Sequence, residues 1–472
     1  MPAARLFIVA VLALLIPSFA HASPERLVVH EWGTFTSLED EGGRTLSYIN
    51  TDDEPVPGFV HGLGRGNKGL YLLPTEMPPP LAQGAPLGHP QITMRLETPV
   101  TYFHLPVGMK SAKLDVAVEF HGGWLTEFYP AGVTLADGKP FAFPKYPELT
   151  EKTVGRLEWK DVVLGGDAKG PQTTEHVWLA PRDVKAANVT IGKQSERFLF
   201  YRGVGHLNAP ITVKQLEGKD LLEINGEFPR ATGVERPPAM WIVDVKPDGR
   251  CAFRAVHSIA AQSNVVRAHA QSSFAETDYA ADTSSLRKEM HAALVSDGLF
   301  DDEATAMLKT WELSYFKSPG TRLFFTVPQG WTDRVLPLTL SQPADVTRVI
   351  VGRIELITPR HRELLGQIAA GPVPNLKEIV GAMAKLQADP ARRETYNALA
   401  SGRGNGKELG VPIPPIYQAY LDLGRFRTAM VLDAAAPERV GREPMIDFSY
   451  EIQMPGVGIA QQRAAQRTAA GG

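Results

Sequence analysis

Three histidines and two carboxylates are the residues of this 472-residue chain whose types are best suited to chemistry. His30, His104 and His121 each lie in or at the end of a predicted strand, where a β scaffold places functional groups. If folding brings the three imidazoles together, they could bind Zn or Cu and leave one position open to water. Glu119 or Glu127 would then act as the base of a metal-assisted hydrolase or oxidase.

The leading hypothesis for the function uses the same region without a metal, and the metal-assisted enzyme is the alternative to it. In this hypothesis the histidines are ordinary surface or hydrogen-bonded residues. Spacing in the sequence does not decide between the two hypotheses, because a metal cluster would depend on contacts between residues far apart in the chain. The protein would be a ligand-binding or envelope-associated protein that takes an unidentified small-molecule or envelope ligand. Its candidate ligand-binding residues are Trp32, Tyr129 and Arg202, of which Arg202 could clamp an anion.

The common catalytic motifs are incomplete in this sequence. His30-Glu31 does not start a zinc-protease motif, because position 34 is Thr and the segment has a strand pattern. Gly64–Gly69 matches a dinucleotide-binding string without its strand and helix, and Gly402–Lys407 lacks the Ser or Thr of a phosphate loop. Ser285–Lys288 lacks the other elements of penicillin-binding enzymes, and no G-x-S-x-G is present.

The residues 28–36 have the composition of a β-strand, with β-branched and aromatic side chains and no proline. Alternation places His30, Trp32 and Thr34 on one face, and Glu31 and Phe35 on the other. His30 and Glu31 should therefore point to opposite sides of a sheet and make no contact.

Several strings along the chain resemble a family of exported bacterial proteins that is known only as uncharacterised. They are Val28–Ser37, Glu97–Val100, Phe198–Gly205, Lys309–Trp311 and Thr321–Phe325. The resemblance spans nearly the whole mature chain. It implies export and carries no activity, so no functional residue is transferred from it.

Residues 1–22 have the pattern of a secretory signal peptide. Arg5 precedes an apolar run at Leu6–Ile16, and Ala20-His21-Ala22 fits the cleavage rule, so we expect a cut after Ala22. No later apolar run reaches the roughly 20 residues that span a bilayer, so no integral membrane segment is expected. The mature protein should be soluble, in the periplasm or outside the cell.

The net charge and the single cysteine exclude one class of partner and one kind of covalent bond. The formal net charge of −3, with mixed signs, gives no electrostatic basis for binding nucleic acid. Cys251 is the single cysteine, so no intrachain disulfide can form, and a buried structural thiol is the favoured interpretation.

The pattern of the chain predicts an α+β protein. We expect a large antiparallel β sandwich or barrel-like core, an inserted αα-hairpin and a C-terminal helical region. The expected segments are a β-rich domain at 23–275 with a Pro/Gly loop at 51–92, a helical hairpin at 276–320, strands at 321–358 that rejoin the core, a helical region with a closing strand at 359–454, and a frayed tail at 455–472.

Overall fold

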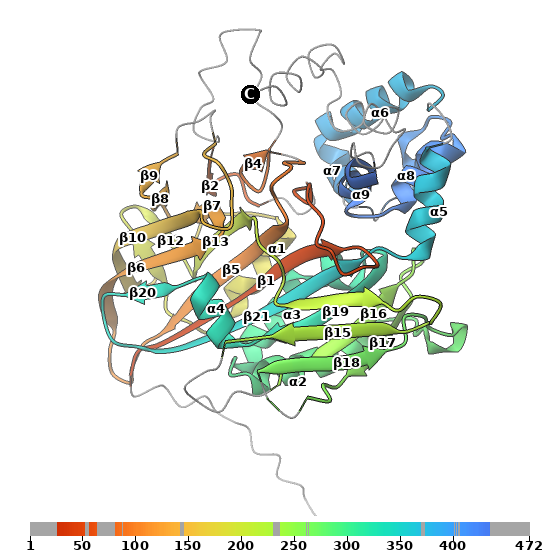
Figure 1. Ribbon diagram of the computed structural model, residues 1–472. Coiled ribbons are helices and arrows are strands. Elements are labelled where there is room, and N and C mark those ends of the chain that lie inside the picture. The colour runs from red at the N-terminus through yellow and green to blue at the C-terminus, as the bar shows by residue number, and fades with distance from the viewer. Residues whose placement is uncertain are drawn as a thin grey trace, which may run out of the picture.

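The computed structural model describes residues 26–434, apart from 52–55, 64–80, 87, 142–145, 230–236, 261, 263, 370–372, 401, 403 and 405. The expected signal peptide, closing strand and frayed tail lie outside the described residues, as do Gly64–Gly69 and much of the loop at 51–92. Within the described part the fold is α+β, as predicted, with a large sheet and a C-terminal group of helices (Figure 1).

A sixteen-stranded sheet forms the body of the protein. Its central path runs β12-β11-β10-β7-β13-β5-β1-β21-β19-β16-β17, and five short or branching strands join it at the side. The strands are β1 (Val28–Glu39), β2 (His61–Gly62), β5 (Met94–His104), β6 (Ser111–His121), β7 (Gly123–Tyr129), β8 (Val133–Ala136), β9 (Lys139–Pro140), β10 (Val154–Gly165), β11 (Val189–Ile191), β12 (Gln194–Glu196), β13 (Leu199–Gly205), β16 (Met240–Val245), β17 (Cys251–Val256), β19 (Gly320–Val327), β20 (Leu338–Leu340) and β21 (Asp345–Leu356).

Two small sheets, nine α-helices and five short 3-10 or π helices complete the described elements; the short helices are Ala180–Asp183, Glu276–Asp278, Glu312–Phe316, Pro390–Arg392 and Gly406–Leu409. The small sheets are β14 (Ile211–Gln215), β15 (Leu222–Glu227) with β18 (Val265–Ala270), and the pair β3 (Leu81–Ala82) and β4 (Ala85–Pro86). The helices are α1 (His176–Leu179), α2 (Ser284–Ser296), α3 (Asp301–Thr310), α4 (Gln329–Val335), α5 (Pro359–Ile368), α6 (Leu376–Ala388), α7 (Arg393–Ala400), α8 (Pro415–Asp422) and α9 (Arg427–Ala434).

Strand β1 lies in the middle of the large sheet. It pairs antiparallel with β5 on one side and parallel with β21 on the other, so the sheet is mixed rather than wholly antiparallel. A parallel pair needs a long crossover connection, and here most of the chain separates the two strands. The predicted alternation on β1 is confirmed: Trp32 packs in the core next to helices α2 and α3, and Phe35 packs in the core on the other face.

The two faces of the sheet around β1 are covered differently. On one face the sheet folds back so that Phe35 meets Phe120 of β6, while Ile224 of β15 packs against the same core beside β19 and β21. On the other face α2 and α3 pack Leu286 and Met307 against the sheet. Helices α5–α9 gather at the upper right of Figure 1, above the right-hand end of β16 and β19, and they share a third core with Leu38 and Ile357.

Two segments differ from the local prediction. The local sequence pattern predicts strands at His176–Leu179 and Arg44–Asn50. His176–Leu179 is instead the short helix α1, which buries Val177 and Trp178. Residues 44–50 form no strand beyond one bridge between Glu39 and Thr45. Both segments are short, and such apolar runs do not distinguish helix, strand and packed loop by pattern alone.

Candidate metal centre

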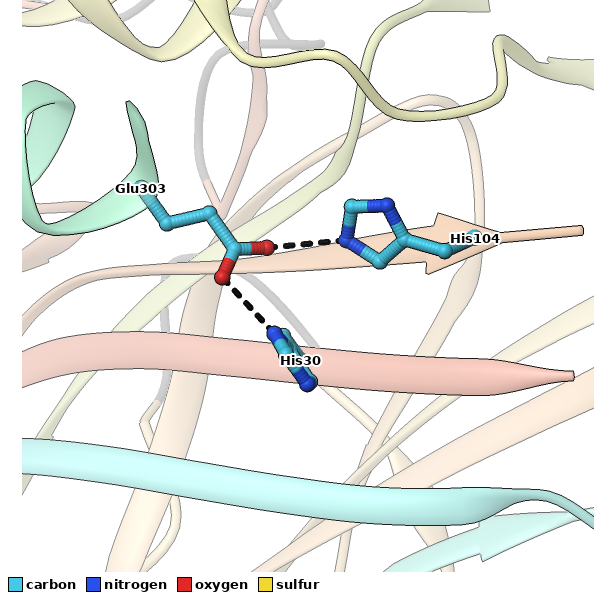
Figure 2. Close-up of side chains that lie close together, drawn as sticks. All are labelled: His30, His104 and Glu303. Carbon is cyan, nitrogen blue, oxygen red and sulfur yellow. Dashed lines mark hydrogen bonds and ion pairs between the residues drawn. The ribbon is translucent and has the colours of Figure 1, made fainter. Parts of the chain in front are cut away.

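His30, His104 and Glu303 form a compact buried group on the helix-covered face of the sheet. Nδ1 of His30 lies 2.7 Å from Oε2 of Glu303, and Nε2 of His104 lies 2.9 Å from Oε1 (Figure 2). All three potential ligand atoms lie within 4.8 Å of one another. Because the residues His30, His104 and Glu303 are 4%, 8% and 0% exposed, the group is enclosed by protein on nearly every side.

The register of β1 and β5 places the two histidines together. His30 is opposite Tyr102, and His104 is opposite Val28, so the two imidazoles occupy diagonal positions on one face of the antiparallel pair. Diagonal neighbours of this kind have Cβ atoms about 7–8 Å apart, within reach of ring side chains. The ring centroids are 5.4 Å apart, in a T-shaped arrangement.

Helix α3 supplies the carboxylate. Phe300 is the N-cap residue of α3, and its backbone N–H donates to Oε2 of Glu303 over 2.8 Å. This bond holds Glu303 in the first turn, where a carboxylate also suits the positive end of the helix dipole. The Phe300 ring packs against both imidazoles, with centroids 4.5 Å from His30 and 4.8 Å from His104.

The electrostatics of the group favour an ionised carboxylate. Burial acts to raise the pKa of Glu303, but the hydrogen bonds from His104 and His30 outweigh burial and lower this pKa to about 2. An ionised carboxylate only accepts hydrogen bonds, so Nδ1 of His30 and Nε2 of His104 each carry a proton in this arrangement. Burial, followed by the negative charge of Glu303, raises the pKa of the neighbouring Tyr102 hydroxyl.

His121, the third histidine expected at a metal site, is elsewhere. Its side chain is 44% exposed, and Nε2 lies 3.0 Å from Oε2 of Glu119. Glu119 also pairs with Arg156 and lies outside the buried group. The structure therefore brings His30 and His104 together but not His121, because His121 ends β6, which pairs with β10 and β20 rather than with β1.

The remaining candidate residues are buried in structural contacts. Glu127, the other candidate base, forms an ion pair with Arg202 across β7 and β13. Trp32 and Tyr129 are core residues, 0% and 2% exposed, that pack against Tyr102 and Trp178 respectively. None of these four side chains belongs to the buried histidine group.

Glu303 was not among the residues predicted from sequence. The sequence carries no capping-box signal for Glu303, because the residue three positions earlier is Phe300, whose side chain has no hydrogen-bond acceptor. Local sequence also does not show that α3 packs this carboxylate against β1 and β5.

Two imidazole nitrogens and one carboxylate oxygen form a ligand set that suits first-row divalent metals, including zinc and copper. In tetrahedral zinc sites with bonds of about 2.0–2.1 Å, neighbouring ligand atoms lie roughly 3.3 Å apart. The N–O distances of 2.7 and 2.9 Å are shorter than this. Metal uptake would therefore require a small expansion of the group and movement of each imidazole proton to its other nitrogen.

Neither a protein-family model nor a curated protein matches this chain. Among solved structures, the chain is similar to the zebrafish (Danio rerio) Fcho1 Mu homology domain with bound Eps15 peptide, at 9% identity and a TM-score of 0.23. That match covers 71% of this chain and 97% of the other. A likeness at this level carries no argument about fold or function.

In the part of the chain that the structure describes, no helix combines the length and the apolar character needed to cross a membrane.

Proposed function

We propose that this protein is exported and binds a divalent metal ion through His30, His104 and Glu303, with zinc as the first candidate and copper as the second. The observation that carries the proposal is the convergence of two imidazoles and one carboxylate within 4.8 Å, from two strands and a helix far apart in sequence. Borderline metals prefer this combination of ligands, and protein that excludes water strengthens the attraction between a cation and a carboxylate.

The three protein ligands would leave a fourth position on a tetrahedral ion. A water molecule there would be acidified by the metal, which is the chemistry of metal-assisted hydrolysis. The low exposure of all three side chains favours an ion that is held tightly and reached only by small molecules. Of the two functions expected from the sequence, the contacts of His30 and His104 favour the metal-dependent one.

The test is metal analysis of the mature protein, purified without chelators and without a histidine tag. We expect one zinc or copper ion per chain in the wild type. His30→Ala, His104→Ala and Glu303→Gln should each weaken zinc affinity by roughly 100-fold, as measured by competition with a chromogenic chelator. His121→Ala, which removes an exposed histidine outside the group, is the matched control and should retain the ion.

A wild type that contains no metal, and does not take up zinc or copper when either ion is added, would refute the proposal. Equal loss of metal in His121→Ala would show that the ion is held elsewhere.

Export is tested separately, because a cytoplasmic protein could bind metal equally well. We expect the N-terminus of the secreted or periplasmic protein to be Ser23, after cleavage behind Ala22. An intact Met1 in a cytoplasmic fraction would contradict export and leave the metal site untouched.

A further inference from the structure

The connection between α2 and α3 follows a fixed path next to the metal centre. The backbone N–H of Gly298 donates to the carbonyl of Val295, and that of Leu299 donates to the carbonyl of Leu294. These two bonds form the cap that commonly ends a helix at a glycine. Leu299 is buried in the core that α2 and α3 share with the sheet, so it fixes the connection to that core.

A glycine at position 298 lets this connection pass close to strand β21. Gly298 has a φ of +113°, a conformation that favours glycine. A Cβ at this position would lie 2.9 Å from Cγ2 of Thr347. Thr347 is the residue of β21 that pairs with His30 of β1. The connection therefore reaches the strand position directly beside one of the proposed metal ligands.

The ring of Phe300, the last residue of the connection, covers both imidazoles. Its centroid lies 4.5 Å from that of His30 and 4.8 Å from that of His104, with the ring planes inclined by 53° and 73°. Aromatic rings prefer such inclined arrangements to face-to-face stacking. Phe300 is half-buried, whereas His30 and His104 are 4% and 8% exposed. The ring therefore forms part of the boundary between the imidazoles and solvent.

The backbone of Phe300 holds the third proposed ligand. Its N–H donates to Oε2 of Glu303 over 2.8 Å, and Nδ1 of His30 lies 2.7 Å from the same oxygen. Phe300 thus contacts all three proposed ligands, two through its ring and one through its backbone. Groups that surround metal ligands in this way orient the ligands and control the access of solvent to the ion.

A phenyl ring at this boundary acts on the rates of metal exchange. The ring carries no nitrogen or oxygen atom that could bind the ion or replace its water. An ion that leaves a buried site must regain water, and the apolar surroundings of the site limit the entry of that water. Because an entering ion meets the same obstruction, the ring should slow binding and release together. The affinity, which is the ratio of the two rates, should depend chiefly on the three ligands.

We infer that the Phe300 ring is the cover of the metal centre and sets the rate at which the bound ion exchanges with solution. The inference rests on the proposed metal function and specifies how that site is regulated. Phe300 is a positioning residue in this role, because it contacts the ligands rather than the ion. The cap at Gly298 and the buried side chain of Leu299 hold the cover in place.

The test is the rate of zinc release from the full mature protein after it has been loaded with zinc. An excess of the chromogenic chelator pyridylazoresorcinol captures each released ion, and its absorbance gives the rate. We expect Phe300→Ala to release zinc at least roughly tenfold faster than wild type. Its equilibrium zinc affinity should change by a smaller factor, because the variant keeps the three ligands and the backbone N–H at position 300.

Two further variants separate the ring from other effects. Phe300→Tyr keeps an aromatic ring and should release zinc at the wild-type rate. Gly298→Ala leaves Phe300 unchanged, but its added Cβ would meet Thr347 and displace the connection, so it should also release zinc faster. An unchanged Tm verifies that each variant is folded, and Gly298→Ala provides the comparison where Phe300→Ala does not fold.

Phe274→Ala is the matched control, because Phe274 is also half-buried and packs against Tyr279 rather than the metal ligands. This variant should release zinc like wild type. Equal release rates in wild type and Phe300→Ala, or an affinity that falls by as much as the release rate rises, would overturn the inference and leave the metal site in place. A wild type that takes up no zinc would refute the proposed metal function and this inference together.

Discussion

At the scale of single residues, Glu303 joins three parts of the fold. Its Oε2 accepts from His30 of β1 and from the backbone of Phe300, and its Oε1 accepts from His104 of β5. One carboxylate therefore caps α3 and fixes the helix to two strands. Removing its charge leaves the imidazole donors and the helix N-terminus less well satisfied, so Glu303 should matter for stability even without a metal ion.

This dependence gives a prediction for acid stability. The pKa of Glu303 is about 2 in the folded protein, against an ordinary value of 4.5. A folded-state pKa that is lowered contributes stability above the unfolded value, and this stability is lost as pH falls from about 4.5 to about 2. In chelator, wild type should lose on the order of 3 kcal/mol more over this window than Glu303→Gln, measured by urea unfolding.

The control for this experiment is Glu312→Gln, which alters a partly exposed carboxylate bonded to Lys317. Its acid sensitivity should stay close to that of wild type, because exposed pairs are screened by solvent. Identical acid profiles for wild type and Glu303→Gln would contradict the role assigned to Glu303.

At the scale of elements, the polar residues of β1 each meet a different neighbour. Glu31 accepts from the hydroxyl of Tyr201, Thr34 contacts the hydroxyl of Tyr315, and Thr36 donates to Glu97. Buried polar groups need such partners to offset their loss of water. The polar residues in the segment 28–37 are therefore explained by the position of β1 in the centre of the sheet, where polar side chains on both faces find hydrogen-bond partners.

Close packing between β7 and β13 explains why residue 203 is a glycine. Gly203 lies at the irregularity where β13 pairs with β7, and a Cβ there would be 2.1 Å from the carbonyl oxygen of Trp124. Gly203→Ala should therefore destabilise the protein by several kcal/mol, since the obstructing atom belongs to the backbone of a neighbouring strand. The free energy of unfolding in urea is the measurement.

Gly381→Ala supplies the matched comparison for Gly203. Gly381 lies within α6, and a Cβ there would meet nothing within 4 Å. Alanine is favoured over glycine inside helices by up to about 1 kcal/mol, so this variant should be neutral or slightly stabilised. A tolerated Gly203→Ala would show that β7 and β13 are less closely packed at this point.

At the scale of the whole molecule, the sheet joins the start of the described chain to a strand more than 300 residues later. Glu31 on β1 and Arg348 on β21 are both fully buried, and Nε of Arg348 donates to Oε2 of Glu31 over 2.7 Å. Tyr201 and Thr101 bond to the other oxygen of Glu31. The pair therefore connects β1, β5, β13 and β21 in the interior of the sheet.

Breaking this pair should be costly, because the remaining charge would be buried without its partner. We predict that Glu31→Gln lowers the free energy of unfolding by about 3–5 kcal/mol, as is typical of buried ion pairs that lose one member. Arg26→Ala, which removes the exposed pair between Arg26 and Asp345 near the same strand ends, should have no measurable effect. Equal effects of the two substitutions on chemical denaturation would contradict the central role of the buried pair.

The sequence by itself predicted the α+β class, a strand at 28–36, the opposite orientation of His30 and Glu31, and helices within the segments 276–320 and 359–454. Each of these follows from local periodicity, cap residues or alternation, which neighbouring residues encode. The tertiary structure alone decided that Glu303, rather than His121, joins His30 and His104, and that β1 pairs in parallel with β21. Such contacts depend on strand register and on helix packing between segments that are distant in sequence. The spacing of residues along the chain does not determine the register or the packing.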